Sequence, residues 1–299
     1  MKFVITGGAG FIGSHIAKHL VEKNHDVVVV DNLSRGRLEN LSKIKEQIEF
    51  KKMDILDFDS LKDVISNSDG IFHQAALTSV PESFLQKEKY HNVNVKGTEN
   101  IFKLAKEFGK KVVYASSSSI YGNTNSIPIQ EISEKNPINP YGVTKLDDEK
   151  LAEKYHNLGV SIIGLRYFNV YGVGQTNDYA GVITKFINQI NLNQSPIIFG
   201  DGSQTRDFIS VEDVAKANLL SMESNTDFSF LNIGTGISTS VKTLAEVMIE
   251  LSGKTLEISY DDLPLGDVKE SLADISLAKK LINWNYNTFL KNGLKKFFF

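Results

Sequence analysis

A tyrosine and a lysine four residues apart form the most chemically suggestive pair in this chain. Tyr141 and Lys145 stand in a segment with the pattern of a helix, where residues at that spacing share one face. A phenol is a poor base at neutral pH because its ordinary pKa is about 10. A neighbouring ammonium would favour the phenolate, which could take the proton of an alcohol while hydride leaves its carbon. The pair predicts alcohol oxidation, although a Tyr and a Lys can also simply decorate a helix surface.

The serines that precede this pair could complete such a site. Ser116 to Ser119 are four consecutive serines after the apolar segment 111–115, which is typical of a buried strand. A serine hydroxyl at the end of that strand could hold the reacting oxygen and stabilise the charge that develops on it.

A glycine-rich turn near the start of the chain indicates the cofactor. Gly7, Gly10 and Gly13 follow the apolar run 1–5 and precede a helical pattern. Glycine at the first place permits a tight turn, at the second a close approach of a pyrophosphate, and at the third close packing of the helix on the strand, while the helix N-terminus attracts the phosphates. A glycine triplet alone is weak evidence, since turns and helix caps also use glycine.

An acidic residue downstream strengthens the prediction. A second apolar run, 26–30, ends in Asp31, eighteen residues after Gly13. An acid about 20 residues beyond the turn is placed to bind the ribose hydroxyls of NAD. The 2′-phosphate of NADP would meet the charge of Asp31, although Arg35 could offset that repulsion. The pattern favours NAD.

Strand and helix patterns alternate about six times in the first part of the chain, which implies a parallel sheet covered on both faces. We therefore expect a doubly wound α/β fold of the Rossmann type. Right-handed crossovers bring the carboxyl ends of the strands to one edge, where ligands bind. The expected strands lie near 1–5, 26–30, 48–52, 70–73, 111–115 and 161–166, and the expected helices over 61–65, 92–108 and 141–157.

The alternation loosens beyond Tyr167. We predict an NAD-binding Rossmann domain over residues 1–167 and a smaller C-terminal substrate-binding domain over 168–299, whose later segments return to the sheet. Within the first domain, Asp54 could accept a hydrogen bond from an adenine amino group or could cap a turn. His73 lies inside a strand and is predicted to be structural.

Composition excludes several classes. The chain has 299 residues, no cysteine and a net charge of −3, so we expect no disulfide, no thiol catalysis, no zinc cluster, and no recruitment to nucleic acid or an anionic membrane. No apolar run is long enough to cross a bilayer. Because Met1-Lys2 leads directly into the first expected strand, we expect no signal peptide. We expect a cytoplasmic enzyme without a metal.

The motifs jointly resemble the extended short-chain dehydrogenase/reductase superfamily. Its features here are the glycine turn at 6–13, Asp31, the serine cluster before Tyr121-Gly122, and the Tyr-x-x-x-Lys pair. Three further segments resemble the nucleotide-sugar 4-epimerases of that superfamily, and together the motifs cover essentially the whole chain. These segments are 165–172 (LRYFNVYG), 206–209 (RDFI) and 266–268 (GDV).

The resemblance implies 4-epimerisation of UDP-sugars through a transient 4-keto intermediate. Tyr141 would be the base, Lys145 its electrostatic partner, and Ser117 the catalytic hydroxyl. NAD would be regenerated in each cycle and stay bound. The implied cofactor contacts are Gly7, Gly10, Phe11, Ile12, Gly13, Asp31, Asn32, Asp54, Ile55, Gln74, Ala75, Ala76, Asn94, Tyr141, Lys145 and Tyr167. The implied substrate contacts are Ser79, Ser117, Ser118, Ser119, Tyr141, Asn169, Arg206, Asp267 and Ser271.

The resemblance also bears on the substrate. Glucose-restricted relatives carry a bulky tyrosine at the place of Ser271, so the small serine implies room for UDP-GlcNAc and UDP-GalNAc beside UDP-Glc and UDP-Gal. Ser271 could also be an ordinary surface serine. The family's diphosphate-binding arginine is replaced by Pro264, which leaves Arg206 or a lysine such as Lys185 to carry more of that contact, or points to a different nucleotide sugar.

Other functions remain open from the sequence. The 4,6-dehydratases and UDP-glucuronate decarboxylases carry acids where this chain has Ser118 and Ser119, so both reactions are disfavoured. A net dehydrogenase with exchangeable cofactor and a non-catalytic NAD-binding regulator are the remaining alternatives. The resemblance further implies a homodimer that uses the helices over 94–108 and 141–157.

Overall fold

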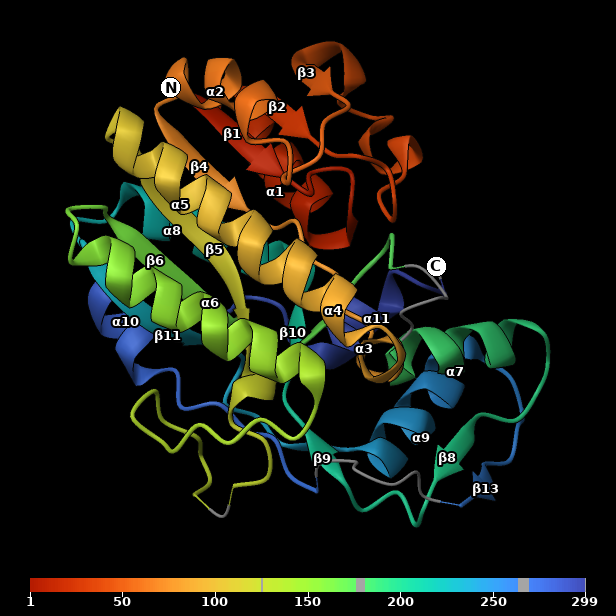
Figure 1. Cartoon of the computed structure of the whole chain (residues 1–299). Helices are drawn as coiled ribbons and strands as arrows, with labels where there is room; N and C mark the ends of the chain where they lie inside the picture. Colours follow the sequence, from red (N-terminus) through yellow and green to blue (C-terminus); the bar gives the residue numbers. More distant parts are fainter. Residues whose placement is uncertain (125, 176–180, 263–268, 299) are drawn as a thin grey trace.

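The computed structural model describes residues 1–124, 126–175, 181–262 and 269–298, and its largest feature is a seven-stranded sheet (Figure 1). All neighbouring strands in this sheet pair in parallel. In spatial order the strands are β11 (Phe228–Ile233), β6 (Ile162–Tyr167), β5 (Lys111–Ser117), β4 (Gly70–His73), β1 (Lys2–Thr6), β2 (Asp26–Val30) and β3 (Ile48–Lys51).

Helices cover both faces of the sheet. On one face lie α2 (Phe58–Ser66), α5 (Gly97–Phe108) and α6 (Pro140–His156). On the other lie α1 (Phe11–Glu22), α8 (Val211–Glu223) and α10 (Ser276–Ile282). The α/β doubly wound fold expected from the sequence is therefore confirmed.

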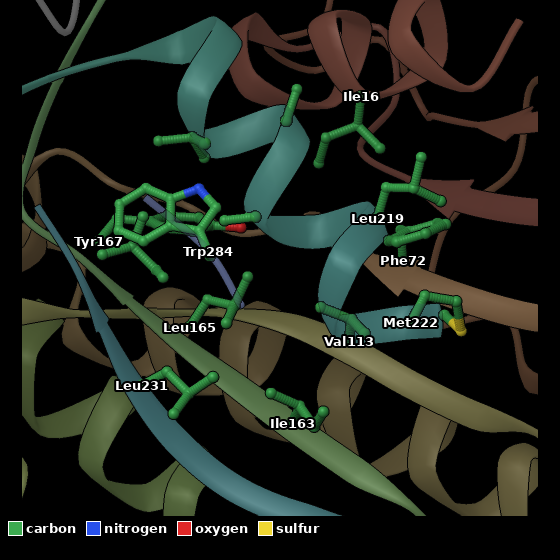
Figure 2. Close-up of a cluster of buried hydrophobic side chains, with 14 of the residues drawn as sticks. Ile16, Phe72, Val113, Ile163, Leu165, Tyr167, Leu219, Met222, Leu231 and Trp284 are labelled. Atoms are coloured by element: carbon green, nitrogen blue, oxygen red, sulfur yellow. The ribbon is translucent and has the colours of Figure 1, made fainter. Parts of the chain in front are cut away.

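The alternation of side chains along each strand produces the two faces. Val27 and Val29 of β2 join the core under α1 and α8, whereas Val28 and Val30 join the core under α2, α5 and α6. Successive side chains of a strand point to opposite faces, so a strand covered on both sides must be apolar throughout. Figure 2 shows the first of these cores, where Trp284 packs beside Leu165 and Tyr167.

A smaller unit follows the first six strands. Its core joins Phe186 of α7 (Val182–Asn191), Leu244 and Met248 of α9 (Val241–Ser252), and Leu294 of α11 (Leu290–Lys295). β11 and α8 belong to the large sheet and its cover, although they come late in the sequence. The division at residue 167 stays a prediction. The short strands of this unit pair as β10 (Phe208–Ser210) with β7 (Asn169–Tyr171), β12 (Thr239–Ser240) with β9 (Thr205–Arg206), and β13 (Ser259–Asp261) with β8 (Ile197–Phe199).

The expected elements agree with the structure to within a few residues. The helix expected over 92–108 is divided into a π-helical stretch, His91–Lys96, and α5. The remaining short elements are α3 (Val80–Leu85), α4 (Lys87–Tyr90), and 3₁₀ turns at Leu38–Leu41, Lys45–Gln47 and Ser118–Ile120.

A buried ion pair fastens α6 to the sheet. Arg166 of β6 donates to both oxygens of Glu149, with Nε–Oε1 at 2.8 Å and Nη2–Oε2 at 2.9 Å. Both side chains are only 1% exposed. Arg166 also donates to Tyr121 Oη at 2.7 Å, and Ser116 Oγ donates to Glu149 Oε1 at 2.8 Å. This network joins β5, β6, α6 and the loop after β5.

We expect Glu149→Ala to lower the free energy of unfolding by about 3–5 kcal/mol, because it leaves the Arg166 guanidinium buried without a counter-charge. Asp147→Ala is the matched control: Asp147 lies two residues earlier in α6 and pairs with the exposed Lys150 at 2.7 Å. We expect that variant to lose at most about 1 kcal/mol. Urea denaturation followed by circular dichroism measures both, and equal losses would contradict the assignment.

Candidate active site

A cavity of about 650 Å³ lies at the carboxyl ends of the parallel strands. It draws its walls from the ends of β1, β2, β4, β5 and β6 and from the start of α6, as the crossover rule requires. The residues predicted from the sequence that line it are Gly7, Gly10, Phe11, Ile12, Gly13, Asp31, Asn32, Asp54, Ile55, Gln74, Ala75, Ala76, Ser79, Ser117, Ser119, Tyr141, Lys145, Tyr167 and Asn169.

The glycine turn leaves space that any side chain would fill. Gly7 has φ +68°, and a Cβ there would lie 2.6 Å from the backbone nitrogen of Ala75. A Cβ on Gly13 would lie 2.2 Å from the oxygen of Gly7, so only glycine lets α1 approach β1 this closely. Gly10 caps α1 without a side chain, and the first-turn residues of α1 line the cavity. The turn therefore fits the diphosphate of a dinucleotide.

Asp31 lies at the end of β2, next to the glycine turn. Its Oδ2 accepts from the backbone N–H of Ala9 at 3.0 Å, and its Oδ1 accepts from Leu33 at 2.8 Å. Burial raises the pKa of Asp31, and these two backbone hydrogen bonds oppose the rise. Each oxygen keeps a lone pair for a ribose hydroxyl. Next to it, Arg35 donates to both carboxylate oxygens of Glu82 at 2.8 and 2.7 Å, so a carboxylate already partners the guanidinium that could have held a 2′-phosphate.

Asp54 makes the turn cap that was one of the two roles expected for it, and its contact with adenine stays a prediction. It caps a turn by accepting from Leu56 N at 2.9 Å, and its other oxygen accepts from Asn32 Nδ2 at 2.8 Å. It also lines the cavity.

Gln74 and Tyr167, which also line the cavity, are held in place by hydrogen bonds that involve α8. Tyr167 Oη donates to Gln74 Oε1 at 3.1 Å, and Asn218 of α8 donates to Tyr167 Oη at 2.8 Å. Burial raises the pKa of Tyr167. This phenol therefore stays protonated at neutral pH and forms part of a fixed wall.

The three predicted catalytic residues come together at the junction of β5 and α6. Ser117 is the last residue of β5, and its Oγ accepts from Ser119 N at 3.1 Å. Asn139 caps α6 by accepting from Gly142 N at 2.8 Å, with Pro140 at the first position. This start places Tyr141 in the first turn and Lys145 one turn later, both on the cavity wall.

His73 is shielded from this chemistry. Its ring nitrogens lie 2.6 Å from Thr6 Oγ1 and 2.9 Å from Thr98 Oγ1. Burial, with a smaller effect of the Lys145 charge, lowers the pKa of His73 to about 3. A neutral histidine with both nitrogens occupied agrees with the structural role predicted for it.

Several predicted contacts lie outside the described cavity wall. Asn94 is fully buried, and its side-chain amide is hydrogen-bonded to the backbone of Leu77. It accepts from Leu77 N at 2.8 Å and donates to Leu77 O at 3.0 Å. It therefore supports the wall from behind. Ser118, Arg206 and Ser271 are not among the described lining residues. Asp267 and Pro264 lie outside the described residues.

Sequence reasoning missed Asp207, which organises the segment that carries Arg206 and Ser271. Asp207 is fully buried, and its carboxylate accepts from Thr235 N at 2.7 Å, Gly236 N at 2.9 Å and Ala273 N at 3.2 Å. Its acidic type within the quoted 206–209 motif was the available signal.

Two negative findings apply to the described residues. None of their helices is long and apolar enough to cross a membrane. No group of three or more His, Cys, Asp or Glu side chains among them is arranged to hold a metal ion.

Comparisons with known proteins agree with this geometry. The model of the NAD dependent epimerase/dehydratase family matches residues 3–234. The solved UDP-N-acetylglucosamine 4-epimerase from Methanobrevibacter ruminantium M1, in complex with UDP-N-acetylmuramic acid, is 37% identical, with a TM-score of 0.95 over 99% of this chain and 96% of that one. The UDP-glucose 4-epimerase of Thermotoga maritima, solved with UDP-glucose, is 35% identical, with a TM-score of 0.94 over 99% and 96%. The UDP-glucuronate 4-epimerase of Thermodesulfobacterium geofontis is 35% identical over 98% of this chain and 94% of the relative. The chain belongs to the NAD dependent epimerase/dehydratase family.

Proposed function

We propose that the protein is an NAD-dependent 4-epimerase that interconverts UDP-Glc with UDP-Gal and UDP-GlcNAc with UDP-GalNAc. The observation that carries the proposal is the convergence of Ser117, Tyr141 and Lys145 on the cavity that the glycine turn and Asp31 also line. The three relatives described above are all 4-epimerases of UDP-sugars.

The residues divide the chemistry as follows. Tyr141 takes the proton of the sugar 4-hydroxyl and later returns it to the same oxygen. The ammonium of Lys145, one turn along the helix, stabilises the phenolate in between, and Ser117 donates a hydrogen bond to the reacting oxygen. When bound, NAD would accept the hydride from C4 and return it to the opposite face of the 4-keto sugar, which inverts that carbon. Because proton and hydride both return, the reaction consumes no cofactor, and we propose that NAD stays bound between turnovers.

The same wall disfavours the related reactions. Ser119 lines the cavity where a dehydratase or decarboxylase would need an acid, and the carboxylates among the described lining residues, Asp31 and Asp54, come from the ends of β2 and β3. The aliphatic hydroxyl of a serine lacks the acid/base ability that elimination of water requires. A non-catalytic binder would not need the serine, tyrosine and lysine at one cavity.

We expect the purified protein to epimerise both UDP-Glc and UDP-GlcNAc without added NAD, because the cofactor is retained and regenerated. Resolving the 4-epimers by NMR measures this directly. Tyr141→Phe removes the proton acceptor and is expected to lower kcat by about 10²- to 10⁴-fold while keeping the bound NAD. Conversion that requires added NAD in stoichiometric amount, with absorbance appearing at 340 nm, would instead identify a net dehydrogenase.

Ser271 is proposed to set the range of sugars. It is nearly buried, 9% exposed, and its backbone N–H donates to Thr205 O at 3.2 Å, beside the strand that carries Arg206. Ser271 is not among the described lining residues of the cavity, so the inference that its small side chain leaves room for a 2-acetamido group rests on its position next to β9.

We expect Ser271→Tyr to lower turnover of UDP-GlcNAc by about 10-fold or more relative to UDP-Glc, because a large ring at this buried position overfills the space. Ser271→Ala is the matched control and should keep both activities. The ratio of kcat/KM for the two substrates is the measurement. A parallel loss of both would point to a structural role for position 271.

We also propose a homodimer that buries the outer surface of α5 and α6, which lie side by side on the sheet (Figure 1). Exposed apolar side chains extend this surface into α3: Phe84 is 52%, Leu85 86% and Val143 44% exposed. Apolar groups gathered in this way are typical of a contact surface.

Light scattering is expected to give twice the chain mass for the wild-type protein and for Leu192→Asp, a control at another exposed leucine, 69% exposed. Leu85→Asp should shift the protein toward monomer. A monomeric wild type at micromolar concentration would contradict the dimer. The cytoplasmic location stays a prediction.

A further inference from the structure

Lys145 is held by an acidic residue of its own helix. Asp148 follows it by three positions, and its Oδ2 accepts from Lys145 Nζ at 3.1 Å. The backbone oxygen of Ala115 in β5 accepts a second bond from Nζ, also at 3.1 Å. An ammonium has three donors, and Lys145 lines the cavity. Two donors are therefore fixed within the protein, and the third is left for the cavity.

Asp148 and Lys145 are both buried, so the interaction between their charges is strong. Asp148 is 0% and Lys145 only 3% exposed. Removal from water disfavours a charged ammonium, whereas an opposite charge within a few ångströms favours it. The interaction is strong because the surroundings have a low dielectric constant. Asp148 therefore supplies the counter-charge of the buried ammonium.

The contrast with the neighbouring Glu149 separates a structural pair from a functional one. Glu149 engages both oxygens with Arg166 and Ser116. Asp148 Oδ1 has no hydrogen-bond partner within the described part of the chain. A buried ion pair with an unfilled acceptor contributes little to fold stability, so its presence beside a catalytic residue calls for a functional explanation.

We propose that Asp148 is a positioning residue: it keeps Lys145 charged and directs the remaining N–H of that lysine into the cavity, toward the cofactor and Tyr141. This inference rests on the proposed function. Asp148 is not among the described residues that line the cavity, so it acts through Lys145.

Few of the groups that face Asp148 change their charge near neutral pH. Burial raises the pKa of Asp148 to about 7, and the charge of Lys145 partly opposes this rise. Tyr114 faces it from β5, with its pKa raised well above the ordinary value by burial. The uncharged hydroxyl of Thr98 in α5 lies close enough to help lower the pKa of Asp148. His73 of β4 stays neutral above its pKa of about 3. On the same helix, Asp147 is engaged with Lys150 at 2.7 Å.

The first test compares Asp148→Asn with Asp147→Asn, a change of the same type one residue away on the exposed side of α6. For Asp148→Asn we expect kcat to fall by about 10- to 100-fold, with the KM for the UDP-sugar within about twofold of wild type. The kcat–pH profile should also change shape, because the ammonium has lost its counter-charge. Asp147→Asn should change neither. A purely structural role would not move the pH profile.

The second test is a double-mutant cycle with Lys145→Met. If Asp148 acts through Lys145, Asp148→Asn should cause no further loss of kcat in the Lys145→Met background. NAD retained after gel filtration, measured by chromatography of the denatured protein, gives a readout independent of turnover, and Asp148→Asn should retain less than Asp147→Asn.

Equal losses in both backgrounds, or wild-type kcat, pH profile and NAD retention in Asp148→Asn, would overturn the proposal. If the wild-type protein converted no UDP-sugar, the proposed function would fail, while the comparison of retained NAD would still test the positioning of Lys145.

Discussion

The parallel direction of all seven strands in the large sheet is the constraint on which the site depends. Parallel strands end at one edge, so β2, β4, β5 and β6 bring Asp31, Gln74, Ser117 and Tyr167 to a single cavity although these residues are far apart in sequence. Cover on both faces requires apolar strand interiors. Polar chemistry is therefore concentrated at the strand ends, where it does not disturb the core.

Helix α6 shows how structure and chemistry can share one element. Its first turns present Tyr141 and Lys145 to the cavity, and its next turn carries two adjacent acids with different tasks. Glu149 satisfies a buried guanidinium and fastens the helix to β6. Asp148 meets Lys145 and leaves one oxygen without a partner among the described residues. Because α6 is fixed on the sheet, the position of Lys145 is also fixed, and a reacting group must be held accurately to be effective.

The sequence predicted what depends on local pattern. The apolar runs predicted β2 and β4 with their observed bounds, and the glycine spacing predicted a turn that leaves no room for a Cβ at Gly7 or Gly13. It could not predict contacts made across the fold. The pairing of Arg35 with Glu82, 47 residues away, is set by how α3 lies against the loop after β2. The two hydrogen bonds between the Asn94 side chain and the backbone of Leu77 are likewise set by tertiary packing, and the cofactor contact of Asn94 stays a prediction.

The segments around Arg206 and Ser271 are held together differently, because their hydrogen bonds are made with backbone groups. Asp207 accepts from the N–H groups of Thr235, Gly236 and Ala273, and Thr205 O accepts from Ser271 N. These bonds place position 271 beside the strand of Arg206 whatever side chain position 271 carries. Under the proposed function, a change of side chain at position 271 alters the room for the sugar while these backbone bonds stay in place. The range of sugars could then change without any change at the β5–α6 junction, where Ser117, Tyr141 and Lys145 line the cavity.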